Sequence, residues 1–225
     1  MIKAVFVDVD NTLLDFDKCA EYAARNAFSD FGLPFGPEVT ERFHEINEGL
    51  WREVEKGTIS RDALFDVRWA RILSALGIEF DGHVLEKRFF SYITEAAEPV
   101  DGANELLEYL ANKYTVCITS NAGFAQQKKR LARAEMLKYV DKLFISEKIG
   151  FAKPERGFFD GCFAELSDVL PCETVIIGDS PTADIKGGSS YGIKTIWYNH
   201  GKMAETGGIH ADFTVDSLDK IKDII

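Results

Sequence analysis

Two aspartates separated by one residue end the first apolar segment of the chain. Asp8 and Asp10 follow the apolar residues 4–7 (AVFV), and residues two apart in an extended strand face the same side. Two uncompensated carboxylates there are costly, because burial and like charge both penalise ionisation. A divalent cation removes this penalty, so the pair predicts a metal site. The alternative is a pair of turn-forming acids, since a short motif alone often arises by chance.

A second acidic pair follows the apolar residues 174–177 (TVII). Asp179 on its own is explained equally well as a helix N-cap, with Pro181 two residues later. Asp184 has no such explanation, because aspartate inside a helix is a poor helix former. Two acids at this spacing suit Mg²⁺, which prefers oxygen ligands and keeps several waters.

Polar residues that suit a phosphate group stand between these two pairs. Ser120 and Asn121 follow the apolar residues 115–119, and Lys153 precedes Pro154. The ordinary explanations are a helix cap or turn for Ser120 and Asn121 and a solvated surface charge for Lys153. However, the chain has a net charge of −11, which repels phosphate. A phosphate site therefore needs local donors and a local cation, and these three residues can supply them.

The apolar runs that end at these residues predict a sheet. Strands are expected over 3–9, 115–119, 142–146, 174–178 and 194–198, with a weaker one over 212–215. Helical patterns separate the later strands: one is capped by Asp101, and the others cover 124–138 and 155–166. This alternation predicts an α/β fold with a Rossmann-like parallel sheet. The polar clusters should meet at the carboxyl ends of its strands, where ligands bind.

Residues 17–95 interrupt this alternation with helical patterns alone. Asp17 and Ser60 are candidate helix caps, and apolar residues recur at three- and four-residue steps throughout the segment. We expect an inserted helical cap domain over 17–95 and a core domain over 1–16 and 96–225. Phe16, Trp51 and Trp69 offer aromatic surface for a substrate, although Trp69 is expected to belong to the core.

Four clusters of polar residues together resemble the four motifs of the haloacid dehalogenase (HAD) superfamily. They are Asp8 with Asp10, Ser120 with Asn121, Lys153, and Asp179 with Asp184. They occur in the same order, and the 17–95 insertion resembles the helical cap of many members. The segments 120–124, 145–147, 152–154 and 195–199 are similar to the YjjG-type branch, whose members are pyrimidine 5′-nucleotidases. This resemblance implies Mg²⁺-dependent hydrolysis of a small phosphomonoester through an aspartyl phosphate.

The same resemblance implies a role for each residue. Asp8 is the nucleophile, and Asp10 is the general acid and then the general base. The phosphoryl oxygens are bound by Ser120, Asn121 and Lys153, of which Ser120 and Lys153 also count as catalytic. Mg²⁺ is held by the Asp8 carboxylate, the Asp10 backbone carbonyl and Asp179, with Asp184 as a ligand or acting through water.

Three other functions share part of this pattern. A dehalogenase of the same fold needs no acid–base aspartate two residues after its nucleophile, so Asp10 argues against it. A sugar-phosphate or phosphoglycolate phosphatase, or a phosphomutase, shares every core motif. A catalytically inactive phosphate-binding module is the third alternative, and the complete set of acids, hydroxyl and lysine argues against it.

Composition narrows the class of partner. The acidic surface disfavours nucleic-acid polymers and anionic membranes, and no apolar run reaches the length of a membrane span. The four cysteines include no C-x-x-C pair, which favours reduced thiols. We therefore expect a cytoplasmic enzyme, a monomer or weak homodimer, that acts on a small molecule.

Overall fold

The computed structural model describes residues 1–201 and 208–225 and forms two compact units. The first, here called the α/β unit, comprises residues 1–15 and 98–225, and the second, the helical unit, comprises 16–97. The corresponding boundaries predicted from the sequence are 16–17 and 95–96. The helical unit is thus inserted between the first and second strands of the α/β unit.

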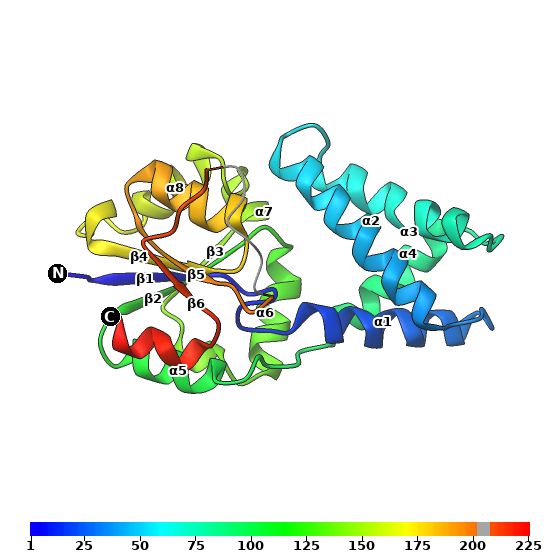
Figure 1. Cartoon of the computed structure of the whole chain (residues 1–225), viewed down its shortest axis with the longest axis horizontal. Helices are drawn as coiled ribbons and strands as arrows, with labels where there is room; N and C mark the ends of the chain where they lie inside the picture. The colour runs from blue at the N-terminus through cyan, green and yellow to red at the C-terminus, as the bar shows by residue number, and fades with distance from the viewer. Residues whose placement is uncertain (202–207) are drawn as a thin grey trace. The chain divides into compact units, whose positions relative to one another are not determined.

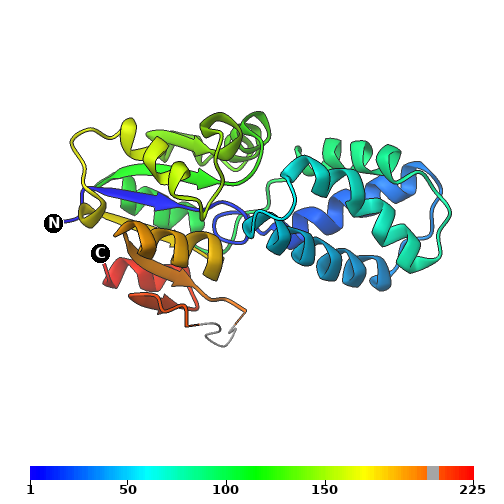
Figure 2. The same ribbon diagram turned by 90° about the horizontal axis from the view of Figure 1, so that it is seen from above.

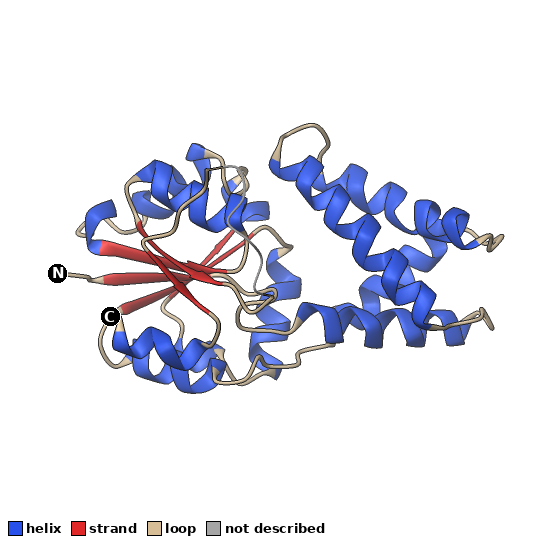
Figure 3. Cartoon of the chain, viewed as in Figure 1, coloured by secondary structure: helices blue, strands red, loops and turns tan. Residues whose placement is uncertain are grey.

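A six-stranded parallel sheet forms the centre of the α/β unit (Figure 3), as predicted. Its strand order is β3-β2-β1-β4-β5-β6. The strands are β1 (Ala4–Val7), β2 (Thr115–Ser120), β3 (Lys142–Ile145), β4 (Thr174–Gly178), β5 (Lys194–Tyr198) and β6 (Phe213–Val215). Every residue of β1 and β4 is buried, as a parallel strand covered on both faces requires.

Helices cover both faces of this sheet (Figure 1). Helix α8 (Arg156–Ala164) lies on one face and α5 (Ala103–Ala111) on the other. The remaining elements are α6 (Phe124–Arg133), α7 (Ser146–Ile149), α9 (Gly187–Tyr191), the 3₁₀ turns η1 (Leu137–Tyr139), η2 (Pro171–Glu173) and η4 (Leu218–Asp223), and the π-helical turn η3 (Pro181–Lys186). A buried cluster that includes Phe6, Phe144, Phe158 and Phe159 joins the sheet to α8.

Three predicted helix boundaries are wrong. The N-cap of α5 is Gly102, whose φ is 82°, and not Asp101. Asp17 lies in the first turn of its helix, which begins at Phe16. The helix predicted over 124–138 ends at Arg133, because Glu135 adopts a left-handed φ of 57°. A left-handed residue ends a helix in this way, and glutamate gives no warning of it in the sequence.

The helical unit is a four-helix bundle (Figure 2). Its helices are α1 (Phe16–Asp30), α2 (Pro37–Glu55), α3 (Arg61–Leu76) and α4 (Gly82–Ile93). The predicted cap of α3 is confirmed, because the Ser60 hydroxyl accepts a hydrogen bond from the Ala63 N–H at 3.1 Å. The ring of Trp69 is fully buried, with the rings of Phe28, Phe43 and Phe89 at 5.5, 5.5 and 5.2 Å. Trp69 therefore belongs to the core of the bundle, as expected.

Two expectations from composition are tested by the described residues. Over 1–201 and 208–225, no helix has both the length and the apolar character needed to cross a bilayer. All four cysteines are free, and only Cys172 is exposed. Burial raises the pKa of Cys117 to about 12, so this thiol stays protonated at neutral pH.

Candidate active site

Two aspartates leave the sheet side by side at its carboxyl edge. Asp8 directly follows β1 and Asp179 directly follows β4, and these strands are neighbours. The Asp8 N–H donates to the Ile177 carbonyl at 2.9 Å, which extends the pairing by one residue. In the order β3-β2-β1-β4-β5-β6, the chain leaves β1 toward β2 on one side and leaves β4 toward β5 on the other side. Ligands of open α/β sheets bind at such a position.

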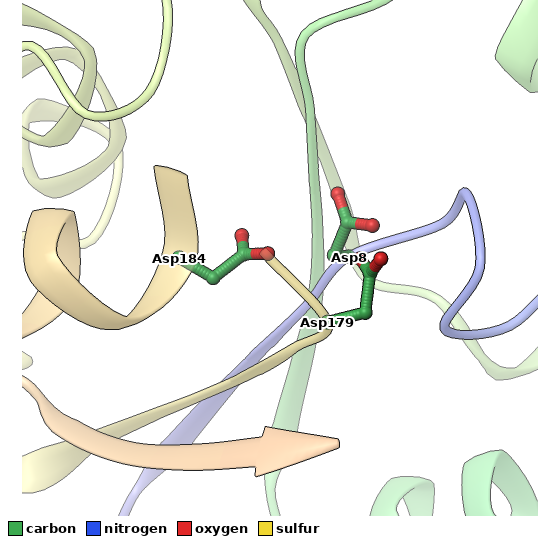
Figure 4. A group of neighbouring side chains, drawn as sticks. All are labelled: Asp8, Asp179 and Asp184. Carbon is green, nitrogen blue, oxygen red and sulfur yellow. The ribbon is translucent and has the colours of Figure 1, made fainter. Parts of the chain in front are cut away.

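Three carboxylates converge at this edge (Figure 4). Ligand atoms of Asp8, Asp179 and Asp184 all lie within 4.8 Å of one another, and Asp8 and Asp184 are 8% and 1% exposed. Asp184 approaches from η3, where its second oxygen accepts from the Ser180 N–H at 3.2 Å. A Cβ on Gly178 would lie 2.2 Å from the Asp184 carboxyl carbon. Only glycine at position 178 therefore allows Asp184 to reach the site.

Lys153 supplies the positive charge in this cluster. Its ammonium is 2.7 Å from Asp8 Oδ1, 2.7 Å from Asp184 Oδ1 and 2.8 Å from the Thr119 carbonyl. A lysine ammonium has three N–H donors, so each contact takes one of them. In this geometry Lys153 fixes the orientation of Asp8, and it contacts a further oxygen only by sharing a donor.

Burial controls the electrostatics of the cluster. It raises the pKa of Asp8 to about 7, with Asp184 and Asp10 adding to the rise and Lys153 opposing it. Burial also raises the pKa of Asp179 well above its usual range, and Asp8 and Asp184 act in the same direction. For Lys153 burial lowers the pKa, but the two adjacent carboxylates outweigh it and leave the pKa raised. The lysine is therefore always a cation here.

Asn121 clamps the segment that carries Lys153. Its amide Nδ2 donates to the Lys153 carbonyl and its Oδ1 accepts from the Lys153 N–H, both at 2.8 Å. The side chain predicted to bind phosphate is thus engaged with the backbone of Lys153. Phosphate binding at Asn121 stays a prediction for its backbone N–H. The reciprocal pair holds the carboxyl end of β2 against the segment of Lys153.

The side chain of Asp10 lies apart from the three clustered carboxylates. Its Oδ2 accepts from Gln127 Nε2 at 2.6 Å, and its Oδ1 accepts from Arg130. Gln127 Nε2 also donates to Ser120 Oγ at 3.0 Å. Gln127 and Arg130 were not among the site residues predicted from the sequence, although both are fully buried. Their spacing of three residues, one turn into the helix after Ser120, was the only signal available.

Two further missed residues hold Asp179. The Thr12 hydroxyl lies 3.4 Å from Asp179 Oδ1, and the Trp197 indole N–H donates to the Asp179 carbonyl at 2.9 Å. Thr12 is fully buried and Trp197 is 3% exposed. These contacts fix both the backbone and the carboxylate at the end of β4.

The donor set fits a divalent cation. Asp8 and Asp184 are buried and Asp179 is half-buried, and these three carboxylates face the single charge of Lys153, so full ionisation leaves two uncompensated negative charges. Buried charges need partners, and a cluster of carboxylate oxygens is the chemistry that Mg²⁺ takes. These residues therefore suit Mg²⁺ better than a neutral ligand or an anion alone.

Comparison with protein families agrees with this site. The family model described as haloacid dehalogenase-like hydrolase matches residues 2–192. The match spans the strands β1 to β4, all four clusters and the helical insertion.

Individual relatives match almost the whole chain. A crystal structure of the HAD-hydrolase YfnB from Bacillus subtilis, bound to magnesium, superposes with a TM-score of 0.95 at 32% identity, covering 99% of this chain and 98% of that one. The pyrimidine 5′-nucleotidase PynA of Streptococcus pneumoniae is 33% identical over 88% of this chain and 84% of its own length. The pyrimidine 5′-nucleotidase YjjG of Escherichia coli is 28% identical over 98% and 96%.

Proposed function

The chain belongs to the haloacid dehalogenase-like hydrolase family, and we propose that it is a Mg²⁺-dependent phosphomonoesterase that acts on pyrimidine nucleoside 5′-monophosphates. The observation that carries the phosphatase part is the cluster of Asp8, Asp179, Asp184 and Lys153 at one sheet edge. The relatives PynA and YjjG, both pyrimidine 5′-nucleotidases, support the substrate class.

The first half-reaction is assigned to the residues after β1. A carboxylate oxygen of Asp8 attacks phosphorus, the bond from phosphorus to the ester oxygen breaks, and Asp10 protonates the departing oxygen. Lys153 holds Asp8 in a fixed orientation for this attack. Mg²⁺, held by Asp8, Asp179, the Asp10 carbonyl and directly or through water by Asp184, would offset the negative charge of the phosphoryl group.

The second half-reaction returns Asp8 to its starting state. Asp10, now a carboxylate, takes a proton from water as the water oxygen attacks phosphorus, and the bond to Asp8 breaks to release phosphate. Ser120 and the backbone N–H of Asn121 are assigned to the phosphoryl oxygens, where charge accumulates in the transition state. Ser120 lies at the carboxyl end of β2 and is 2% exposed.

The helical unit is assigned to recognition of the leaving group. Trp51 and Phe16 are partly buried aromatic side chains of this unit, whereas Trp69 is fully enclosed. An aromatic face stacks on any nucleobase, so Trp51 and Phe16 are the candidates for contact with the base.

The cytoplasmic location and the monomeric or weakly dimeric state remain predictions.

A substrate panel tests the proposal. We expect kcat/KM for dUMP, UMP and dTMP to exceed the values for AMP, glucose 6-phosphate and phosphoglycolate. If a sugar phosphate or phosphoglycolate is preferred by tenfold or more, about 1.4 kcal/mol in transition-state binding, the enzyme is a sugar-phosphate or phosphoglycolate phosphatase instead. If no phosphomonoester is hydrolysed with Mg²⁺ present, the phosphatase assignment itself is wrong.

A further inference from the structure

A closed set of hydrogen bonds on α6 links two of the residues assigned to the reaction. Arg130 Nη1 donates to Asp10 Oδ1 and, at 3.0 Å, to Gln127 Oε1. Gln127 Nε2 donates to Asp10 Oδ2 at 2.6 Å and to Ser120 Oγ at 3.0 Å. Gln127 and Arg130 are three residues apart and so lie on one face of the helix. Arg130 Nη1 and Gln127 Nε2 thus each donate both of their N–H groups to acceptors within this set.

We infer that Gln127 and Arg130 are positioning residues, which orient the carboxylate of Asp10 and the hydroxyl of Ser120 for phosphoryl transfer. The inference rests on the proposed phosphatase function and adds two residues to it. Neither residue was assigned a role by the motifs, because both stand on a helix with a mainly polar sequence.

The direction of each hydrogen bond follows from the chemistry of arginine. A guanidinium has donors only, so the oxygen of the Gln127 amide must face Arg130 and its NH₂ must face Asp10 and Ser120. The Ser120 oxygen then accepts from Gln127, which leaves the hydroxyl proton free to point elsewhere. A phosphoryl oxygen can only accept, so this orientation provides the donor that it needs. Arg130 therefore sets the orientation of Ser120 through Gln127.

The same set holds Asp10 from one side. Both of its oxygens are bound, yet the side chain is 31% exposed, so its remaining lone pairs face away from α6. An acid–base group must sit within hydrogen-bond reach of the oxygen that it serves. A displacement of about 1 Å can cost about 100-fold in rate. Two fixed donors from a helix hold the carboxylate against such a displacement.

The burial of Arg130 makes its carboxylate partner necessary. The guanidinium is fully buried, and a buried charge is tolerated only with a partner. The partner is a carboxylate that the proposed reaction requires in a defined place. A purely structural ion pair would give the same burial, so the test must distinguish positioning from stability.

The test compares two neighbouring glutamines on α6. Gln127→Leu removes the amide at similar volume, and Gln126→Leu is the matched control one residue away, at a partly exposed position. Rates are measured with phenyl phosphate and with p-nitrophenyl phosphate, whose leaving group needs less protonation. We expect Gln127→Leu to lose about 100-fold on phenyl phosphate and about tenfold on p-nitrophenyl phosphate. Gln126→Leu should stay within about twofold on both.

Double-mutant cycles give a readout that a structural role would not move. We expect the loss from Gln127→Leu to fall to about tenfold or less in an Asp10→Asn background, and to shrink in a Ser120→Ala background. If Gln127→Leu does not fold, Arg130→Lys takes its place, because it keeps the charge but cannot reproduce the two directed N–H groups.

The outcomes separate the inference from the proposed function. If Asp10→Asn keeps wild-type rates, the acid–base assignment fails and the inference falls with it. If Asp10→Asn loses its rate while Gln127→Leu and Arg130→Lys match Gln126→Leu, only the inference is overturned. The inference is also overturned if Gln127→Leu lowers the rate equally on both substrates and if its fold-loss is the same in the Asp10→Asn and Ser120→Ala backgrounds as in wild type. That result would indicate a contribution to stability alone.

Discussion

The two units each bury an ionic cluster, and the clusters differ in their balance of charge. In the helical unit, Arg68 binds both oxygens of Glu86 and donates to Asn47 Oδ1 at 3.0 Å. The Arg68 guanidinium lies 5.5, 5.1 and 4.9 Å from the ring centres of Phe43, Phe65 and Phe89. One cation meets one anion there. In the α/β unit, Lys153 pairs with two carboxylates, Asp8 and Asp184, and a third, Asp179, lies beside them.

This difference separates a structural cluster from a candidate site. The helical-unit cluster balances its own charges within an aromatic enclosure. The α/β cluster has one positive charge for three carboxylates, and burial raises the pKa of Asp8 to about 7. Buried polar groups are costly unless they are compensated. The unbalanced cluster therefore requires something from outside the chain, and the balanced one does not.

The largest expected effect comes from Asp8→Asn. Loss of the nucleophile should reduce turnover of p-nitrophenyl phosphate by on the order of 10⁴-fold or more. The raised pKa means that ionised Asp8 opposes folding of the metal-free protein, with a penalty that grows as the pH rises toward 7. At pH 8 without metal, the uncharged variant should therefore melt no lower than wild type. Substantial residual turnover would refute the nucleophile assignment.

Removal of the divalent cation should also abolish turnover. We expect EDTA to inactivate the enzyme and Mg²⁺ to restore it, because Asp8, Asp179 and Asp184 need an added positive charge. Without substrate, Mg²⁺ should raise the melting temperature, by the equivalent of about 2.7 kcal/mol at 100 times its Kd. The rise should be much smaller in Asp179→Asn. Full activity in a verified metal-free preparation would contradict the metal assignment.

Breaking the balanced cluster should cost stability instead. Glu86→Gln leaves the Arg68 charge buried without its carboxylate, and removal of one partner of a buried pair costs about 3–5 kcal/mol. Urea unfolding measures this loss. Residual folded protein should still bind Mg²⁺, since the carboxylates proposed to hold the metal belong to the other unit. An unfolding free energy equal to that of wild type would show that the pair is not structural.

The smallest effect is expected when the whole balanced cluster is replaced. The triple variant Asn47→Leu, Arg68→Met, Glu86→Leu removes every member together, so no buried polar group loses its partner. Such replacements are often neutral or stabilising by about 1–4 kcal/mol. Urea unfolding should therefore place this variant at or above wild type and well above Glu86→Gln. If the triple variant is as unstable as Glu86→Gln, the cluster contributes through specific packing rather than charge balance.

The fold was more accessible from the sequence than the contacts within the site. Apolar runs marked β1 and β4 clearly because these strands are buried along their whole length, whereas β6, exposed at two of its three residues, gave a weaker pattern. The ends of helices were less certain, since Glu135 and Gly102 adopt left-handed conformations that the sequence pattern did not indicate. The partners of the motif residues were not predictable. From the sequence, Gln127 and Arg130 had no role beyond that of ordinary residues in a polar helix. Asn121 was predicted as a phosphate ligand, whereas its side chain hydrogen-bonds to the backbone of Lys153.

Local sequence patterns were enough to place particular residues at the carboxyl ends of strands. Asp8, Ser120 and Asp179 follow directly from apolar runs and parallel pairing, which are local properties of the chain and its period. The grouping of the carboxylates around one site, in contrast, depends on contacts between distant segments. Asp184 joins Asp8 and Asp179 because Gly178 leaves room for it, whereas Asp10, two residues from Asp8, binds α6 instead. Side-chain partners such as those of Asp10 depend on packing between distant segments, which spacing along the chain does not specify.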